Sequence, residues 1–317
     1  MITSILPWLA ILAGFAGLIW SADRFIDGSA AIANNFGVPK LLIGLTVVAF
    51  GTSAPEIVVS VSASLRGAGE IAIGNAIGSN LANIGLVLGI TTLLAPLTFK
   101  HHMLRQEVPI MLAIMGIAGW FLYNGELSQR EGILLVSLMI PLIGWLIYNK
   151  KQHPEEEEDI PSMGMLSAAL WFGIGLALLV TSAEVLVWGA TTIATGFGIS
   201  PLVIGLTVIA IGTSLPELAA SVMSTLKGHY DIAIGNVIGS NIFNLLLVAG
   251  IPAIIHPLSM TEDVFYRDYL SMIALTGALC LLMLCAVFIR KKPTIGRMSG
   301  IALLILYVGY YTLLIFG

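Results

Sequence analysis

The chain has 317 residues, of which 57% are hydrophobic and 10% charged, with a mean hydropathy of +0.97 and a net charge of -4. This composition lies outside ordinary globular usage and within the class of polytopic membrane proteins, whose core is packed in the lipid bilayer. The charges fall in short connectors and form no continuous basic face, so the sequence predicts no nucleic-acid partner and gives no sign of an obligatory protein partner.

Apolar stretches of about 20 residues predict ten membrane-spanning helices. In chain order they cover residues 5–33, 39–65, 70–95, 104–123, 131–149, 164–194, 200–226, 231–255, 268–289 and 297–316. An acidic linker, 150–163, separates a first five-helix half (1–149) from a second (164–317). Its run 155–159 is typical of a solvated loop, and a regulatory calcium-binding patch stays open as the alternative.

The two halves repeat each other. GLTVVAFGTSAPE at 44–56 recurs as GLTVIAIGTSLPE at 205–217, and AIGNAIGSN at 72–80 recurs as AIGNVIGSN at 233–241, all at one offset of 161 residues (217 minus 56). Because each half has an odd number of predicted spans, the second half must enter the membrane upside down. The sequence therefore predicts an all-α membrane protein built from two inverted-topology five-helix repeats.

Charge asymmetry predicts the orientation. Of the 14 Lys and Arg residues, the loops after the second, fourth, sixth and eighth spans hold only Arg66, Arg130 and Arg267, which leaves 11 (14 minus 3) for the opposite side. By the positive-inside rule both termini face outward and the linker is cytoplasmic. The first and sixth spans look longer than the bilayer needs, and they are either tilted scaffold helices or a pair that slides during transport.

Four charged residues, Asp23, Arg24, Asp27 and Glu184, lie near the predicted ends of these two long spans. Snorkelling towards the interface accounts for them best, with a water-filled vestibule as the alternative. The five histidines lie in or beside connectors without the spacing of a zinc site, and the two cysteines share one apolar run, where both are expected to act as small hydrophobic residues.

The second span contains a helix breaker at its most polar point. Pro55 has no N–H for the carbonyl of Gly51, so the helix should break there and free the carbonyls of Ala49 and Phe50. The proline can open a second half-helix with Glu56 in its first turn, where the positive end of the helix dipole favours the ionised carboxylate. The same arrangement is predicted for the repeat copy.

Glu56 and Glu217 are ionisable groups inside long apolar runs, and neither motif contains a Lys or Arg to neutralise them. Facing each other across the two-fold axis, they would repel strongly unless a divalent cation lay between them. Four hydroxyls and the freed carbonyls complete an all-oxygen shell of the kind that hard cations prefer. These hydroxyls belong to Thr52, Ser53, Thr213 and Ser214.

The third and eighth spans add a second tier of neutral oxygens. Ser79 and Asn83 are four residues apart and share one helical face, as do Ser240 and Asn244. Buried amides within lipid need partners, and both copies keep them, so this face is expected to belong to the ion site.

These motifs resemble the alpha repeats of the cation/calcium exchanger superfamily, most closely those of its prokaryotic sodium/calcium exchangers. The resemblance covers the whole chain and implies a ten-helix exchanger of a prokaryotic plasma (inner) membrane, without a cofactor, in which Glu56 and Glu217 hold calcium. It implies that Asn83 completes the central tier and that sodium is shared among further residues. These are both carboxylates with Thr52, Thr213, Ser53, Ser214, Ser79, Ser240 and the carbonyls of Ala49 and Ala210. Family members often carry Asp where this chain has Asn244, so that position has no proton-coupling role here, although a neutral amide still offers an oxygen to sodium.

The sequence thus predicts an antiporter that exchanges calcium for sodium by alternating access. A calcium/proton antiporter is the first alternative, and a passive cation channel is a further one. An intramembrane enzyme is disfavoured because no histidine, cysteine or metal cluster accompanies the glutamates. With only two carboxylates, one calcium or two sodium ions leave the site neutral, whereas three sodium ions leave it at plus one.

Overall fold

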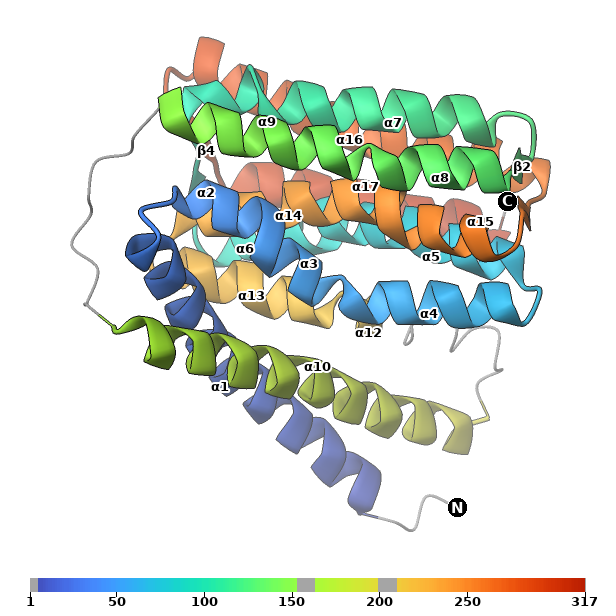
Figure 1. Ribbon diagram of the computed structural model, residues 1–317. Coiled ribbons are helices and arrows are strands. Elements are labelled where there is room, and N and C mark those ends of the chain that lie inside the picture. Colours follow the sequence, from blue (N-terminus) through green and yellow to red (C-terminus); the bar gives the residue numbers. More distant parts are fainter. Residues whose placement is uncertain (1–4, 153–162, 199–209, 317) are drawn as a thin grey trace.

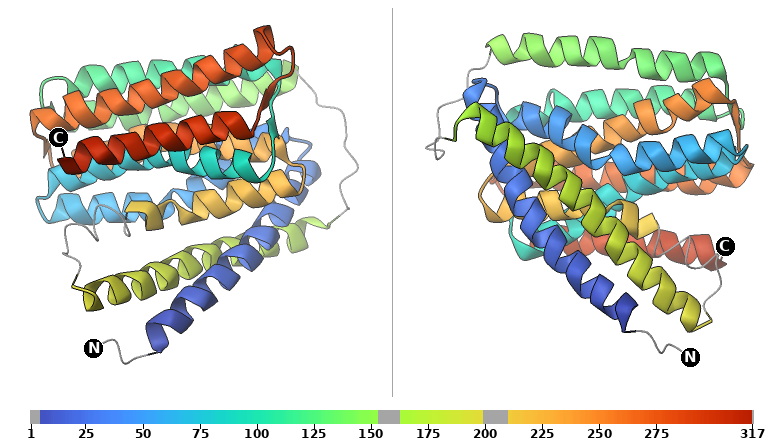
Figure 2. Two further views of the ribbon diagram at one scale, coloured as in Figure 1. Left: turned by 180° about the vertical axis from the view of Figure 1, so that it is seen from behind. Right: turned by 60° about the horizontal axis from the view of Figure 1, so that its bottom comes forward.

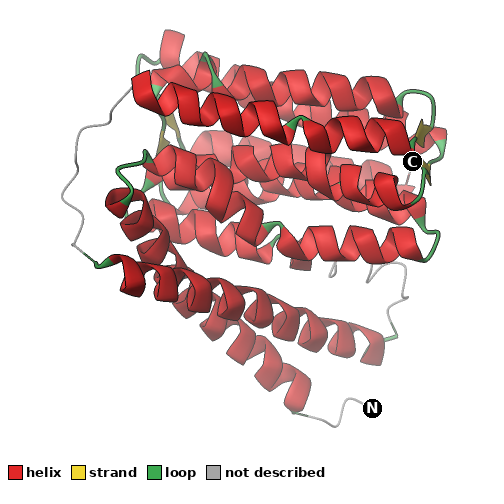
Figure 3. Cartoon of the chain, viewed as in Figure 1, coloured by secondary structure: helices red, strands yellow, loops and turns green. Residues whose placement is uncertain are grey.

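The computed structural model describes residues 5–152, 163–198 and 210–316, and these are helical almost throughout (Figures 1 and 3). The first half contains α1 (Leu6–Asn35), α2 (Lys40–Ile43), α3 (Ala49–Thr52), α4 (Ala54–Leu65), α5 (Gly69–Ala82), α6 (Leu88–Leu94), α7 (Glu107–Leu122), α8 (Gln129–Ser137) and α9 (Met139–Gln152). The second contains α10 (Met165–Gly196), α12 (Ala210–Thr213), α13 (Leu215–Leu226), α14 (Tyr230–Phe243), α15 (Gly250–Ile255), α16 (Leu270–Phe288) and α17 (Arg297–Phe316).

Short π-helical turns join several of these helices into longer spans. They are Gly44–Val48, Asn83–Val87, Asn244–Val248 and Val264–Tyr269. Single π-turns of this kind are frequent at functional sites, because they rotate the side chains that follow relative to those before. Gly44–Val48 begins the first repeated motif, and Asn83–Val87 and Asn244–Val248 follow shortly after the other two copies, so the irregular backbone is concentrated around the polar residues.

The repeat in the sequence is also a repeat of structure. Helices α4 and α13 have 12 residues each, and α5 and α14 have 14 each, all at the same offset of 161 (215 minus 54, 230 minus 69). Helices α5 and α14 lie at the centre of the bundle, where most of their residues are buried. Helix α14 of the second half packs against α2, α3 and the π-turn before α3, so the two halves interleave.

Two short antiparallel strand pairs tie the halves together. Strand β1 (Leu97–Thr98) pairs with β4 (Thr294–Ile295), and β2 (Glu126–Leu127) pairs with β3 (Leu258–Ser259). Each pair joins one strand of the first half to one of the second, and Figure 1 shows the pairs at opposite ends of the bundle. Equivalent connectors, β1 and β3, therefore lie at opposite ends.

Helices α1 and α10 form a layer of their own, oblique to the other helices (Figures 1 and 2). A separate apolar cluster holds this layer to α13 and to the start of the second span, with Phe25, Ile26, Val48, Leu179 and Ala220 among its buried members. The large apolar side chains Trp8, Leu12, Ile19 and Trp188 stay exposed on this layer.

The two cysteines, Cys280 and Cys285, are free and half-buried on α16.

The described residues do not confirm all ten of the spans that the sequence predicted. Seven described helices, or eight with the bent pair α2–α4, are long and apolar enough to cross a membrane. Helix α7 has 16 residues and a length of about 24 Å, which is less than the roughly 30 Å hydrocarbon core. The predicted span 200–226 lies partly outside the described residues, as does most of the predicted linker 150–163.

Candidate functional site

Both repeated GTSxPE motifs lie at a break between two helices. The second span bends by 45° between α3 and α4, at Ser53. Its backbone there has φ -83° and ψ 4°, and Ser214 in the second half has φ -88° and ψ 4°. Pro55 in the first turn of α4 has no N–H to donate to the preceding turn, so the helical hydrogen bonds of α3 end there. A new helix begins, with Glu56 in its first turn. The predicted break is confirmed.

The break does not free the Ala49 carbonyl as expected. That carbonyl accepts a hydrogen bond from the Ser53 N–H at 3.0 Å, so the preceding helix uses it up to the break. The Thr52 hydroxyl also lies within hydrogen-bond distance of this oxygen, at 3.3 Å. The second half differs, because the Ser214 N–H donates to Ile211 at 3.1 Å. Ala210 opens α12 there, and the role of its carbonyl stays a prediction.

The two breaks bring the two glutamates together. Glu56 and Glu217 are 0% and 1% exposed, and the Ser53 hydroxyl donates to Oε1 of Glu217 at 3.1 Å. The Thr213 hydroxyl faces the carboxyl of Glu56, and the two carboxyls lie within Coulombic range of each other. The carboxyl of Glu217 is thus held by a hydroxyl from the opposite half. Among the described residues, no Lys or Arg forms an ion pair with either glutamate.

Several buried oxygens at this point have no hydrogen-bond partner in the described part of the chain. Both carboxyl oxygens of Glu56, Oε2 of Glu217 and the Ser214 hydroxyl belong to this group. Burying even one ionised carboxylate without a partner is costly, and burying two side by side is more so. An ionised pair of carboxylates at this position would need a bound cation or a proton to offset its charge.

Asn236 on α14 positions the second glutamate, a role that the sequence analysis did not assign. Its side-chain N–H groups donate to the Glu217 carbonyl at 3.3 Å and to the Ser221 hydroxyl at 3.0 Å. Its Oδ1 accepts from the Thr52 hydroxyl of the first half at 3.1 Å. One fully buried amide thus fixes the turn that carries the glutamate and orients a hydroxyl across the two-fold axis.

Asn75 on α5 repeats this arrangement 161 residues earlier. It donates to the Glu56 carbonyl at 3.0 Å and to the Ser60 hydroxyl at 2.9 Å. The available sequence signal was the GN pair that opens both GNxxGSN motifs, together with a serine four residues after each glutamate. Neither signal reveals that the amide reaches back to the preceding helix, because that contact depends on how the helices pack.

The second tier of predicted ligands is buried beside these groups. Ser79 and Ser240 are 4% and 0% exposed, and Asn83 and Asn244 are each 1% exposed. The Asn244 amide donates to Oδ1 of Asn80 at 3.0 Å, which links the two halves a second time. Both polar atoms of Asn83, the Ser240 hydroxyl and Oδ1 of Asn244 have no partner among the described residues.

The donor set is poor in charge and rich in neutral oxygens. Within residues 5–152, 163–198 and 210–316, no group of three or more His, Cys, Asp or Glu side chains could hold a metal ion. Two carboxyls surrounded by hydroxyl, amide and carbonyl oxygens suit a hard cation such as Ca²⁺ or Na⁺ and offer nothing to a soft one. Whether the predicted ligands bind an ion together stays a prediction.

The chain belongs to the sodium/calcium exchanger protein family. The family's profile matches residues 6–148 and 167–316, which is nearly the whole chain and both repeats. The protein is therefore a membrane protein of a family of cation/calcium exchangers.

Known relatives and solved structures are similar to this chain over nearly its whole length. Inner membrane protein YrbG of Escherichia coli (strain K12) is 40% identical over 303 residues, with 92% of each chain covered. Sodium/calcium exchanger MaX1 of Methanosarcina acetivorans is 32% identical, with 98% of each chain covered. The structure of the sodium-calcium exchanger NCX_Mj soaked with Na⁺ and Ca²⁺ superposes with a TM-score of 0.84 at 33% identity, and covers 98% of this chain and 99% of that one.

Proposed function

We propose that this protein is a secondary antiporter that exchanges calcium for sodium, with the ions held between Glu56 and Glu217. The observation that carries the proposal is the pair of buried carboxyls whose oxygens have no partner and no basic neighbour in the described residues. Calcium neutralises both charges at once, and sodium ions replace it one charge at a time. The family and the names of two relatives support the same pair of ions.

The ligand set of the proposed site comprises twelve residues drawn equally from the two halves. They are Ala49, Thr52, Ser53, Glu56, Ser79 and Asn83 with Ala210, Thr213, Ser214, Glu217, Ser240 and Asn244. Their burial and their contacts across the halves support shared use by one or more cations. Oxygen atoms left without hydrogen-bond partners are concentrated in this set, which favours it over any other polar group in the described chain.

Ten helices in two inverted halves would place this site near the middle of the bilayer and allow access from one side at a time. The opposite-end location of the β1·β4 and β2·β3 pairs supports the inverted arrangement. The charge asymmetry of the connectors supports outward-facing termini. The name of one relative supports placement in a bacterial inner membrane.

Calcium flux in proteoliposomes tests the proposal. Vesicles loaded with calcium should release it when a sodium gradient is imposed. The rate of release should fall by at least about 100-fold in Glu56→Gln and in Glu217→Gln, because one charge is lost from the pair. Glu126→Gln, at an exposed position of strand β2, is a matched control and should exchange as the wild type does. Undiminished exchange in Glu56→Gln, with the protein folded, would contradict the assignment.

The counter-ion is tested in the same vesicles. Sodium, potassium or a pH gradient is supplied as the only driving ion, and calcium release is expected with sodium. Release driven by a pH gradient in the absence of sodium would favour the calcium/proton alternative instead. Single-channel currents of millions of ions per second would favour a passive channel.

A further inference from the structure

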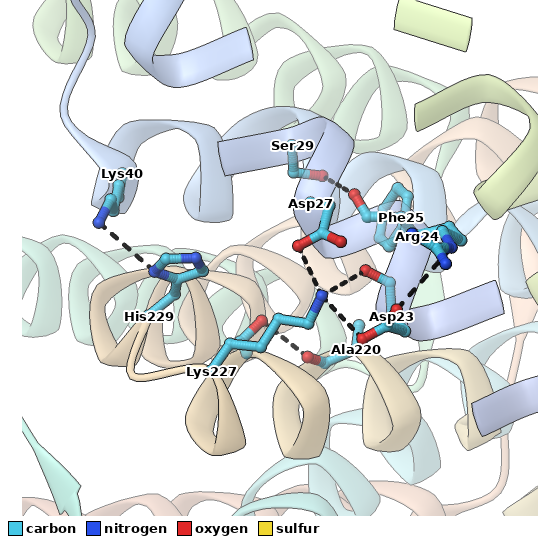
Figure 4. A network of polar contacts seen from close by, with 10 residues as sticks. Asp23, Arg24, Phe25, Asp27, Ser29, Lys40, Ala220, Lys227 and His229 are labelled. Atoms are coloured by element: carbon cyan, nitrogen blue, oxygen red, sulfur yellow. Dashed lines mark hydrogen bonds and ion pairs between the residues drawn. The ribbon is translucent and has the colours of Figure 1, made fainter. Parts of the chain in front are cut away.

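Ion pairs connect the α1/α10 layer to the bundle beside α13. Lys227, which directly follows α13, forms ion pairs with Asp23 at 2.8 Å and Asp27 at 2.5 Å, and it also donates to the Asp23 carbonyl at 2.9 Å (Figure 4). Both aspartates lie on α1, one turn apart, so a single ammonium group spans them. The sequence alone assigned no partner to these aspartates, and the structure adds one at the end of α13.

The two helices of the layer pack against each other closely enough to move as one body. A Cβ on Gly28 of α1 would lie 2.4 Å from the Phe172 backbone nitrogen on α10, and a Cβ on Gly175 of α10 would lie 2.6 Å from the Phe25 nitrogen on α1. Figures 1 and 2 show this layer close to α13 where α1 ends and diverging from α4 towards the end of α10.

The repeat provides a second set of the same charges further along α10. At the offset of 161 residues, Asp23 corresponds to Glu184 on α10, and Lys227 corresponds to Arg66, which directly follows α4 as Lys227 follows α13. Glu184 and Arg66 are both exposed and form no ion pair with any described residue. Glu184 lies well inside a 32-residue apolar helix, where an unpaired carboxylate is costly.

We propose that these charges form two alternative ion-pair latches, one joining α1 to the end of α13 and the other joining α10 to the end of α4, and that only one latch is closed at a time. The inference rests on the proposed alternating access. In an inverted repeat, exchanging the conformations of the two halves converts one access state into the other. The Asp23–Lys227 latch is closed here, and the opposite state closes Glu184 on Arg66. From the loop charges, the latch closed here lies at the cytoplasmic end.

The two latches are unequal in strength. Asp27 adds a second carboxylate to the first latch, whereas its counterpart in the second half is Trp188. Both aspartates are about one-third exposed, so each pair stabilises its state only modestly. The state with Lys227 paired is favoured, and Asp27→Asn should raise the fraction in the opposite state about two- to fivefold.

Cross-linking tests the latches directly. One variant carries Asp23→Cys with Lys227→Cys, the other Glu184→Cys with Arg66→Cys, and each is treated in oriented vesicles with a short bis-methanethiosulfonate reagent, which links the two thiols through disulfides. Both pairs should cross-link on a gel, and each cross-link should stop calcium exchange until it is reduced. The locked forms should take up ⁴⁵Ca²⁺ from opposite faces of the membrane. Failure of the second pair to cross-link, or uptake from the same face by both, would overturn the proposal.

The background and the control keep the result interpretable. Cys280→Ala and Cys285→Ala remove the native thiols before the pairs are introduced. Thr98→Cys with Thr294→Cys joins β1 to β4, whose hydroxyls lie 3.4 Å apart, and this cross-link should leave exchange intact because the two strands stay paired. If the background variant itself exchanges no calcium for sodium, the proposed function fails, while the two cross-linking yields still report on the latches.

Discussion

Glu56 and Glu217 meet in a closed environment without a cation supplied by the described protein. Two like charges about 4 Å apart repel by about 4 kcal/mol at an effective dielectric constant of about 20. A folded protein is stabilised by about 5 to 15 kcal/mol in all, so this repulsion is a large fraction of the whole. A cation bound as proposed would therefore stabilise the local packing in addition to being transported.

The amide of Asn236 is the residue whose loss should separate positioning from binding. Asn236→Ala removes the contacts to Glu217, Ser221 and Thr52 but leaves every predicted ligand in place. We expect the KM for calcium to rise about tenfold or more, as the loss of buried hydrogen bonds worth about 1 to 3 kcal/mol implies. Calcium-dependent exchange across a range of concentrations measures it.

A double-mutant cycle with Thr52→Ala provides the control. If Asn236 acts through the Thr52 hydroxyl, the combined variant should lose less calcium affinity than the sum of the single variants. Strict additivity, or an unchanged KM in folded Asn236→Ala, would mean that the amide serves packing alone.

At the scale of the element, the break between α3 and α4 sets the direction of the glutamate. Pro55→Ala restores an N–H that can donate to Gly51 and lets the helix continue, since proline within a helix costs about 3 kcal/mol relative to alanine. We expect calcium exchange to slow about tenfold or more while the thermal midpoint stays equal or rises. Pro109→Ala, in the first turn of α7, is the matched control and should change neither. Loss of folding in Pro55→Ala would show that the break is needed for stability instead.

The connector before α7 contains a pH-sensitive contact. His102 Nδ1 lies 3.4 Å from Oε2 of the buried Glu107, and this partner raises the pKa of His102 above its ordinary value. A raised folded-state pKa means that the stabilisation is fully present below the unfolded pKa of about 6.5 and is lost as the pH rises through the folded value. The stability lost in His102→Asn should therefore be larger at pH 5.5 than at pH 8.5. Thermal unfolding in detergent measures the difference, and an equal loss at both pH values would contradict it.

At the scale of the whole molecule, the two halves meet at the proposed ion site, so an ion bound there should stabilise the entire fold. At 100 times its dissociation constant, a ligand that binds only the folded state adds about 2.7 kcal/mol. We expect calcium to raise the unfolding midpoint of the wild type in detergent and to have little effect on Glu56→Gln. A midpoint that calcium leaves unmoved in the wild type would argue against binding between the halves.

Much of this architecture could be predicted because its causes are local in the sequence. A proline stops a helix wherever it occurs, and a repeated motif predicts a repeated structure, so the breaks beside Pro55 and Pro216 and the meeting of the two glutamates followed from composition and offset. Two features could not be predicted. The hydrogen bonds of Asn236 to Glu217 depend on how neighbouring helices pack, and the hydrogen bond that the Ala49 carbonyl accepts depends on where the helix stops.

The strand pairs also affect how the chain is made. Leu97 of β1 can pair with Ile295 of β4 only when the chain has been synthesised almost to its last helix. Leu127 of β2 can likewise pair only after Leu258 of β3 has been synthesised. A newly synthesised N-terminal half therefore has unpaired backbone donors and acceptors on β1 and β2 until the C-terminal half is made. We expect this half alone to be a substrate for membrane quality control. Two separately translated halves, brought together in one cell, should rescue each other.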